Sequence, residues 1–484
     1  MRRFGIASVV DVALLLALVA GFLGLLGYYG DTLVPVFPDE ITFLQPAEGL
    51  ARGRGMGTPI LDGLLPGIDQ RTYWQPPGYF LCLALWGKVF GFEPLSARWL
   101  SRVLGVLGLL LLWRLALRWG VAKVGAWLCV LWTALDLTYQ YGANLARMDI
   151  LNAVAVMATL FAFTLAWERN DLRALGWAGV AIAVAVLTHL IALPLAIGLT
   201  FVARRRWGWW GVGVFLFPLA LGGALWAVYI AQDVSSFVAQ MGAQFARKAM
   251  FADRPFWLSV LFAQGIFGFG FFGAFPTNVP PFLPFVVLCL YAAWRYRALP
   301  RWQAFALALA YMAAALGGEI WYVGWFAPFG YLAIAMAGRE IAKVAPKGQA
   351  WLAALGLLWA GFQTWQVAHA VAAVPTMRAD IQHYFAELAK RLPAKAIVVL
   401  HSVPDPAFFL QRHRPDLRLY ELSPTPMPSE ALARLRAQNP FFVGVPRWLK
   451  DHIVCGNEQF QPLGVWNLRF GAQRFQLVLA RCQP

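Results

Sequence analysis

Two adjacent carboxylates, Asp39 and Glu40, follow the first apolar run of the chain and come directly after Phe37 and Pro38. A carboxylate pair can accept a proton from a reacting hydroxyl group, or it can hold a hard cation. An ordinary solvated loop also contains Asp-Glu pairs, so the two residues alone do not choose between a catalytic and a structural role. The residues around them in the sequence add to this evidence.

The segment around these acids is rich in positive charge. Its basic residues are Arg52, Arg54, Arg71, Lys88, Arg98 and Arg102. Guanidinium groups pair bidentately with phosphate oxygens, so a phosphate-bearing ligand accounts for them. An anionic lipid surface accounts for them equally well. With Arg247 and Lys248 from a later segment, Arg54 and Arg71 are our candidates for stabilising negative charge on a leaving phosphate.

Other ionisable residues border apolar runs, where such groups are functional candidates by default. Arg147 and Asp149 open one run, His189 follows another, and Glu319 lies at the outer end of a third. For Arg147 and Asp149, an ion pair that fixes helix packing is an equal explanation. For His189, the alternative is a histidine with a purely structural hydrogen bond.

The composition indicates that membrane helices position these residues. Hydrophobic residues make up 60% of the chain and charged residues 13%, with a mean hydropathy of +0.59. Soluble domains carry about 25% charged residues. The net charge of +16 would suggest a nucleic-acid ligand in a soluble protein. Here the Lys and Arg residues flank apolar runs, as the positive-inside rule requires, so we expect no nucleic-acid partner.

Basic clusters alternate with loops that lack them, and this alternation predicts the topology. The clusters assigned to the cytoplasm are Arg2-Arg3, Arg114/Arg118/Lys123, Arg169/Arg173, Arg204–Arg206, Arg295/Arg297/Arg301 and Arg339/Lys343/Lys347. About eleven crossings follow, at residues 6–29, 97–117, 124–141, 148–167, 173–188, 190–203, 209–230, 281–296, 302–317, 321–338 and 349–372. The apolar stretches 78–92 and 257–275 do not fit this alternation and are predicted to lie along the outer interface.

This topology divides the chain into two domains. Residues 1–375 form the transmembrane domain, with long extracytoplasmic loops at 30–97 and 231–256. Residues 376–484 read as a small extracytoplasmic α/β domain, because strand-like runs at 396–400 and 441–445 flank a helix-like segment at 429–438. In such a compartment Cys455 and Cys482 are able to form a disulfide. The grouping of His401, Ser402 and Asp405 after a strand arises easily by chance, so we assign the tail no catalytic role.

In their order and spacing, these motifs resemble the GT-C membrane glycosyltransferases. The nearest group is that of the protein O-mannosyltransferases and lipid A aminoarabinose transferases. The resemblance covers about residues 1–340 and rests on no single motif. It is carried by Asp39-Glu40 after the first helix, the Pro-Pro-aromatic segment Tyr73–Phe80, Ser96-Ala97-Arg98, the Arg-x-Asp sequence at Arg147–Asp149, Leu187-Thr188-His189, and the aromatic-to-proline stretch Trp321–Pro328.

The resemblance implies an all-α polytopic enzyme of the plasma or inner membrane that works on the extracytoplasmic face. Such enzymes take one sugar from a polyprenyl-phosphate carrier and pass it to an acceptor, with inversion. The acceptor here, whether lipid, glycan or protein, stays open. Asp39 is the implied general base, with Glu40 beside it. The remaining implied substrate-binding residues are Arg54, Arg71, Tyr73, Gln75, Arg98, Arg147, Asp149, His189, Arg247, Lys248 and Glu319.

The chain also departs from this pattern. Relatives often have a basic residue or histidine before the Pro-Pro pair, where this chain has Gln75, and His189 is our candidate to replace the missing phosphate contact. No cofactor is required by the resemblance, but a divalent cation held by Asp39, Glu40 and Asp149 stays open. The alternative function is a transporter or flippase, which predicts inverted repeats and polar residues at mid-membrane. The sequence shows no such repeat.

Overall fold

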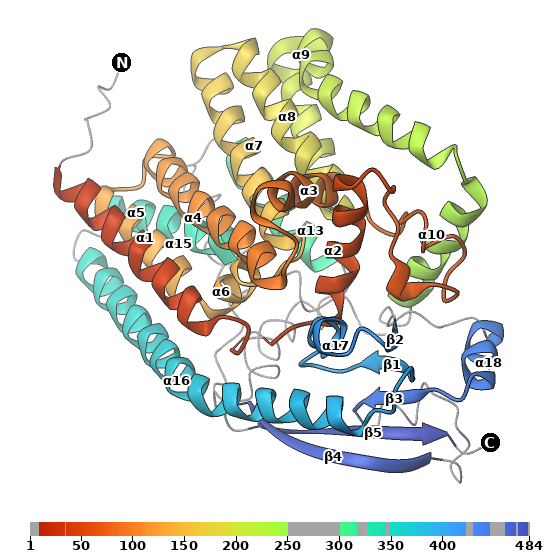
Figure 1. Ribbon diagram of the computed structural model, residues 1–484. Helices are drawn as coiled ribbons and strands as arrows, with labels where there is room; N and C mark the ends of the chain where they lie inside the picture. Colours follow the sequence, from red (N-terminus) through yellow and green to blue (C-terminus); the bar gives the residue numbers. More distant parts are fainter. Residues whose placement is uncertain are drawn as a thin grey trace.

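The computed structural model in Figure 1 describes residues 9–33, 35–249, 301–316, 327–344, 348–422, 429–445, 460–470 and 473–482. A bundle of helices occupies the upper part of that view, and a β-sheet formed by the end of the chain lies beneath it. The predicted helix at 281–296 and the predicted interfacial stretch at 257–275 fall outside the described residues.

Four of the described helical segments are long and apolar enough to cross a membrane. They are α1 (Val9–Tyr29), α4 (Pro94–Arg118), α7 (Asp149–Arg169) and the segment Leu190–Ile230, in which the short helix η2 (Leu190–Ala192) leads into α9 (Leu193–Ile230). The shorter apolar helices α3 (Gly78–Phe90), α5 (Lys123–Leu135) and α8 (Leu172–Thr188) accompany them. The chain is therefore an integral membrane protein.

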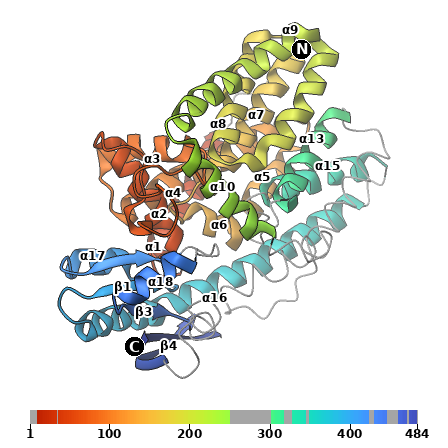
Figure 2. The same ribbon diagram turned by 90° about the vertical axis from the view of Figure 1, so that its right-hand side faces the viewer.

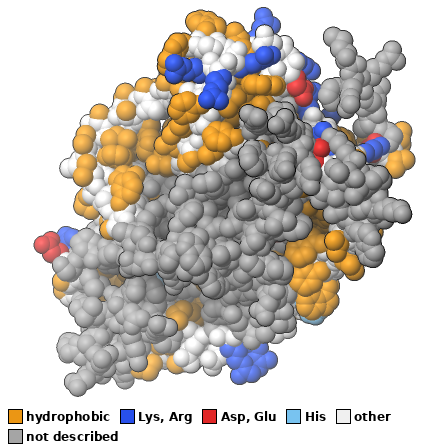
Figure 3. Space-filling model, turned by 180° about the vertical axis from the view of Figure 1, so that it is seen from behind, with side chains coloured by type: hydrophobic (Ala, Val, Ile, Leu, Met, Phe, Trp, Pro, Cys, Tyr) orange, Lys and Arg blue, Asp and Glu red, His pale blue; other side chains and the backbone are white. Residues whose placement is uncertain are grey.

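The surface of α9 has the character of a lipid-facing helix. Phe201, Trp210, Phe217 and Leu225 are all exposed along it. Figure 3 shows apolar side chains over much of the described surface, with Lys and Arg gathered at its upper edge. Water would make so much exposed apolar surface unfavourable, whereas lipid accommodates it.

Packing within the bundle follows the chain. Helix α7 packs against α4 and α8, and α8 packs against α9, while α5 contacts α15 (Ala327–Val344) and α16 (Gly348–Arg391). Helix α13 (Arg301–Leu316) lies against α9. Close approach depends on small residues: a Cβ on Gly108 of α4 would lie 2.4 Å from the Tyr139 hydroxyl. That hydroxyl donates to the Gly105 carbonyl at 2.7 Å.

Four predicted spans have different limits in the structure. The predicted span 124–141 is interrupted at Asp136, whose carboxylate accepts backbone N–H groups of Thr138 and Tyr139 and so starts a new helix, α6 (Leu137–Ala143). Helix α9 contains both 190–203 and 209–230, but Gly208 has a non-helical backbone with φ 68° and ψ −160°, so a kink separates the two parts where a turn was predicted. Helix α16 extends far beyond the predicted end at residue 372.

The two long loops contain helices that the sequence analysis did not predict. Residues 30–97 include α2 (Pro38–Ala51) and the single turn η1 (Pro59–Leu61), and α3 occupies the predicted interfacial stretch. Residues 231–256 include α10 (Val234–Ala249). The side-chain amide of Gln240 in α10 connects this helix to the first loop. Its Nε2 donates to the carbonyls of Pro66 and Arg71 at 3.0 and 2.9 Å.

The tail forms a five-stranded mixed sheet in the order β2-β1-β3-β5-β4. Its strands are β1 (Ile397–His401), β2 (Arg418–Glu421), β3 (Phe441–Gly444), β4 (Phe460–Phe470) and β5 (Gln473–Cys482). Strand β1 is parallel to β2 and β3, while β5 is antiparallel to β3 and β4. The short helices are α17 (Ala407–His413) and α18 (Ser429–Ala437). Figure 2 shows α16 running from the bundle to this sheet, where it contacts β4.

The sheet docks on the first loop. The backbone N–H of Asp405 donates to the carbonyl of Val36 at 2.8 Å, and Arg418 lies 3.5 Å from Asp62. Helix α17 contacts α2, and β2 contacts η1. Asp405 follows β1 and Glu421 ends β2, so the carboxyl ends of two parallel strands face the helix that begins at Pro38.

Candidate active site

The first turn of α2 separates the two acids that the sequence places side by side. Pro38 occupies the first turn of the helix, and Glu40 accepts a hydrogen bond from the Phe37 N–H at 3.0 Å, which fixes where the helix begins. Successive residues of an α-helix project about 100° apart. Asp39 and Glu40 therefore point in different directions.

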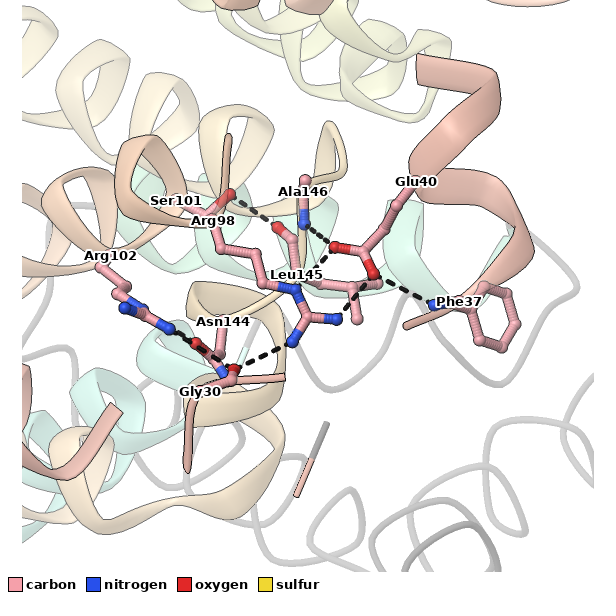
Figure 4. A network of polar contacts seen from close by, with 9 residues as sticks. All are labelled: Gly30, Phe37, Glu40, Arg98, Ser101, Arg102, Asn144, Leu145 and Ala146. Carbon is pink, nitrogen blue, oxygen red and sulfur yellow. Dashed lines mark hydrogen bonds and ion pairs between the residues drawn. The ribbon is translucent and has the colours of Figure 1, made fainter. Parts of the chain in front are cut away.

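Glu40 points into the protein and is fully buried. Its Oε2 lies 2.6 Å from Nη2 of Arg98, and its Oε1 accepts from Arg98 Nε and from the Ala146 N–H, both at 2.9 Å. Arg98 is fully buried as well, and its Nη1 donates to the Gly30 carbonyl at 3.0 Å (Figure 4). The charges of Glu40 and Arg98, predicted as a catalytic and a substrate-binding residue, thus meet each other inside the protein, and neither residue lines the cleft described below.

More hydrogen bonds extend this network toward neighbouring helices. Arg102 Nε donates to Asn144 Oδ1 at 2.9 Å, and Asn144 Nδ2 donates to the Gly30 carbonyl at 3.0 Å. Ser101 Oγ donates to the Leu145 carbonyl at 2.6 Å. Figure 4 shows these groups converging from the end of α1, the start of α4 and the segment before α7. The start of α2 is thereby fixed relative to three membrane helices.

Asp39 points the other way and takes part in an ionic cluster. Nη1 of Arg147 lies 3.0 Å from its Oδ2, and Nε of the same guanidinium lies 3.2 Å from Asp149 Oδ2. Arg147 and Asp149 are buried, whereas the Asp39 side chain is 22% exposed. The guanidinium also lies 5.7 Å from the centre of the Phe37 ring. Arg147 therefore orients Asp39 while leaving part of its carboxylate accessible.

The accessible side of Asp39 lines a cleft of about 400 Å³, a volume that includes its open mouth. Asp39 and Thr42 of α2, together with Trp74 of the first loop, form one side. Gln244 of α10 contributes another, and the tail contributes Glu421 and Leu422. Three parts of the chain that are far apart in sequence thus meet around one carboxylate.

The other predicted substrate-binding residues have varied locations. Arg54 is exposed and Arg71 is half-buried, and neither lines this cleft. Tyr73 is fully buried, and its ring lies 5.3 Å from the Tyr229 ring at a tilt of 53°. Its hydroxyl donates to the Tyr229 carbonyl at 3.4 Å, so Tyr73 contributes to packing between the first loop and α9. Gln75 is buried.

His189 forms the junction of α8 and η2, where its Nδ1 accepts the Ile191 N–H at 3.1 Å. Arg247 and Lys248 lie on α10 just beyond Gln244, while their side chains and Glu319 lie outside the described residues. Of the predicted site residues, Asp39, Arg147 and Asp149 thus lie together, a meeting that the sequence analysis did not predict, and the described candidates Arg54 and Arg71 lie outside the cleft.

Two tail residues were not predicted for the site. Asp405 and Glu421 are both buried and lie within hydrogen-bond reach of one another. Burial raises the pKa of Asp405 to about 7, and burial together with the neighbouring Asp405 raises the pKa of Glu421 well above its usual range. Asp405 stands out in the sequence beside His401 and Ser402, but nothing there indicates that it meets Glu421.

The proposed cation ligands do not come together. In the described part of the chain, no three His, Cys, Asp or Glu side chains converge as metal ligands would. Asp39 and Asp149 each face Arg147, and Glu40 faces Arg98. Because guanidinium groups occupy the positions where a cation would bind, these three residues do not fit a shared metal site, and no reaction step is assigned to one.

Comparison with known proteins agrees with this architecture. Residues 74–220, less than a third of the chain, match the model of the dolichyl-phosphate-mannose-protein mannosyltransferase family. The structure of ArnT from Cupriavidus metallidurans bound to undecaprenyl phosphate is 16% identical, with a TM-score of 0.57 over 97% of both chains. Archaeal oligosaccharyltransferase AglB from Archaeoglobus fulgidus is 13% identical, with a TM-score of 0.53 over 92% of this chain and 70% of its own. No curated protein sequence gives a significant match.

At these identities the structural similarity shows the fold alone. The chain therefore shares its overall fold with the ArnT and AglB structures. The family match over residues 74–220 adds the activity, so the chain is a glycosyltransferase of GT-C type. The predicted resemblance is confirmed at this level.

Proposed function

We propose that this protein transfers a single sugar from a polyprenyl-phosphate carrier to an acceptor on the extracytoplasmic face, with Asp39 as general base. The observation that carries the proposal is the position of Asp39, which Arg147 orients and which remains accessible in the cleft. The lipid carrier is proposed by analogy, because the ArnT structure of the same fold was determined with undecaprenyl phosphate bound.

In the proposed reaction, the acceptor hydroxyl donates its proton to Asp39 as its oxygen attacks the anomeric carbon. The bond between that carbon and the phosphate oxygen breaks, and its electron pair leaves with the lipid phosphate. Attack from the opposite side inverts the anomeric centre. Positive charge must face the phosphate as its negative charge grows, and Arg54, Arg71, Arg247 and Lys248 remain our candidates for that role.

The distribution of charge supports the proposed orientation. Arg204, Arg205 and Arg206 lie beside the kink of α9, at the end of the bundle remote from the tail sheet (Figure 1). The positive-inside rule assigns that end to the cytoplasm. The cleft and the tail sheet would then face the other side of the membrane.

The test is Asp39→Asn in the full-length protein reconstituted in nanodiscs. Transfer from membrane-extracted polyprenyl-phosphate sugars should fall by about 10²-fold or more, the contribution typical of a general base. Binding of undecaprenyl phosphate should be retained. Glu48→Gln is the matched control, since Glu48 lies on the same helix but pairs with Arg52 outside the cleft. Unchanged transfer by the Asp39→Asn variant would reject the assigned base.

A further inference from the structure

Glu421 faces the cleft from the tail sheet, and a second buried acid, Asp405, lies beside it. Asp405 follows β1, where its Oδ1 accepts the Ala407 N–H at 2.7 Å, and Glu421 is the last residue of the adjacent parallel strand β2. The carboxyl ends of parallel strands meet at one edge of a sheet, which is where such sheets bind ligands. Glu421 lines the same cleft as Asp39.

These side chains have polar atoms that the described part of the protein leaves without hydrogen-bond partners. They are Oδ2 of Asp405, both carboxyl oxygens of Glu421, and Nε1 of Trp74, which also lines the cleft. A single shared proton allows one hydrogen bond between the two carboxyl groups, which leaves one Glu421 oxygen and the Trp74 indole N–H without a hydrogen bond; His401 Nδ1 lies 3.8 Å from Glu421 Oε1, beyond hydrogen-bond distance. Buried polar groups are rarely left in this state, so the cleft is suited to a ligand that supplies the missing partners.

We propose that Glu421, held in place by Asp405, binds the acceptor and that this acceptor is a carbohydrate that presents neighbouring hydroxyl groups. The proposal rests on the proposed function, because it names the acceptor that Asp39 would deprotonate. A hydroxyl group both donates and accepts hydrogen bonds. Adjacent hydroxyls can therefore donate to Glu421 and accept from the Trp74 indole N–H within one cleft.

The lining of the cleft argues against two other acceptors. A phosphate group carries negative charge, and the described lining offers it two acids, Asp39 and Glu421, and no basic side chain. A serine or threonine side chain of a peptide presents one hydroxyl, which the attack on the sugar would use, so only backbone N–H groups would be left to donate to Glu421. A carbohydrate retains further hydroxyls after one of them reacts.

The experiment uses the full-length protein in nanodiscs, with membrane-extracted polyprenyl-phosphate sugars as donor. Three probe acceptors are compared by mass spectrometry of the products: dodecyl maltoside, dodecyl phosphate and a threonine-containing lipopeptide. The wild-type protein should prefer dodecyl maltoside. Glu421→Gln should raise the KM for this probe by about tenfold or more, because the amide nitrogen that replaces one carboxyl oxygen cannot accept a hydrogen bond, while kcat at saturating acceptor changes much less.

Two further variants separate contact from packing. Asp405→Asn retains the carboxylate of Glu421, so its KM should change less than that of Glu421→Gln. Glu430→Gln, an exposed acid on α18, should leave every parameter unchanged. Undecaprenyl-phosphate binding reports whether each variant is folded. If Glu421→Gln fails this test, Glu421→Asp replaces it, because aspartate keeps the carboxyl group but withdraws it by one methylene group.

Preference for dodecyl phosphate or the lipopeptide would overturn the proposal, and so would an unchanged KM in Glu421→Gln. Failure of the underlying function has a different signature. In that case the wild-type protein neither binds undecaprenyl phosphate nor transfers sugar to any of the three probes.

Discussion

Asp39 and Glu40 are neighbours in sequence with opposite surroundings. Glu40 is fully buried against Arg98, and Asp39 reaches the cleft beside Arg147. The sequence indicated an acid pair near phosphate-binding arginines, but it could not distinguish the two acids. The directions of the two side chains depend on the first turn of α2, a helix that no apolar run in the sequence predicts. Assigning a role to each acid therefore required the structure.

The buried pair of Glu40 and Arg98 gives a stability prediction. Replacing Arg98 with Leu leaves the Glu40 carboxylate buried without its counter-ion, and breaking such a pair typically costs about 3–5 kcal/mol. The free energy of unfolding, measured by SDS titration in detergent micelles, should fall by about 3–5 kcal/mol. Arg52→Leu is the control, because Arg52 is 58% exposed in an i,i+4 pair with Glu48 and such pairs contribute about 0.5 kcal/mol or less. Equal losses in the two variants would contradict a positioning role for Arg98.

At the scale of elements, the sequence predicted the membrane helices well. A lipid-spanning helix requires about 20 predominantly apolar residues, so α1, α4 and α7 are visible in the sequence as long apolar runs. Helices α2 and α10 were missed because they mix polar and apolar residues within loops. The interruption at Asp136 was missed because a single capping residue inside an apolar run does not alter its hydropathy.

One contact between elements determines how α3 lies beside α8. A Cβ on Gly78, the first residue of α3, would lie 2.7 Å from the Leu187 carbonyl oxygen and 2.9 Å from Thr188 Oγ1. Gly78→Ala should force the two helices apart at a cost of about 1–3 kcal/mol. Because Pro76, Pro77 and Trp74 lead directly into α3, sugar transfer should fall as well.

Thermal unfolding and the nanodisc transfer assay measure both effects of Gly78→Ala. The control is Gly21→Ala in α1, where a new Cβ would meet nothing within 4 Å. In an exposed helical position, alanine is favoured over glycine by about 1 kcal/mol, so this variant should be as stable as the wild type or more so. If Gly78→Ala behaved like the control, α3 would not depend on close contact with α8.

At the scale of the whole molecule, docking of the tail sheet brings Glu421 to the cleft that Asp39 lines. Asp405 meets the first loop through its N–H bond to Val36, and Glu421 reaches the lining beside Asp39. The sequence correctly indicated strands and a helix in the tail. It could not indicate this meeting, since residues near opposite ends of the chain are brought together only by docking of the sheet on α2.

This arrangement predicts a pH dependence of stability. Burial raises the pKa of Asp405 to about 7, and burial together with the neighbouring Asp405 raises the pKa of Glu421 well above its usual range. In an unfolded chain both groups titrate near about pH 4. The folded protein therefore retains protons that the unfolded chain has lost, so this contribution is fully present below about pH 4 and disappears as the pH rises through about 7. Asp39, Glu40, His401 and Tyr384 also face this pair and act on its charge.

Comparing variants isolates the pair from these neighbours. The amide side chain introduced by Asp405→Asn cannot titrate, so the melting temperature of this variant should rise relative to wild type as the pH increases from about 5 to about 8. Asp416→Asn is the matched control in the same sheet domain. A hydrogen bond from Arg414 holds the pKa of Asp416 well below its usual range, so the contribution of Asp416 is already complete at about pH 5 and the difference from wild type should stay constant. A constant difference for Asp405→Asn too would show that the acids at this junction do not share a proton in the folded protein.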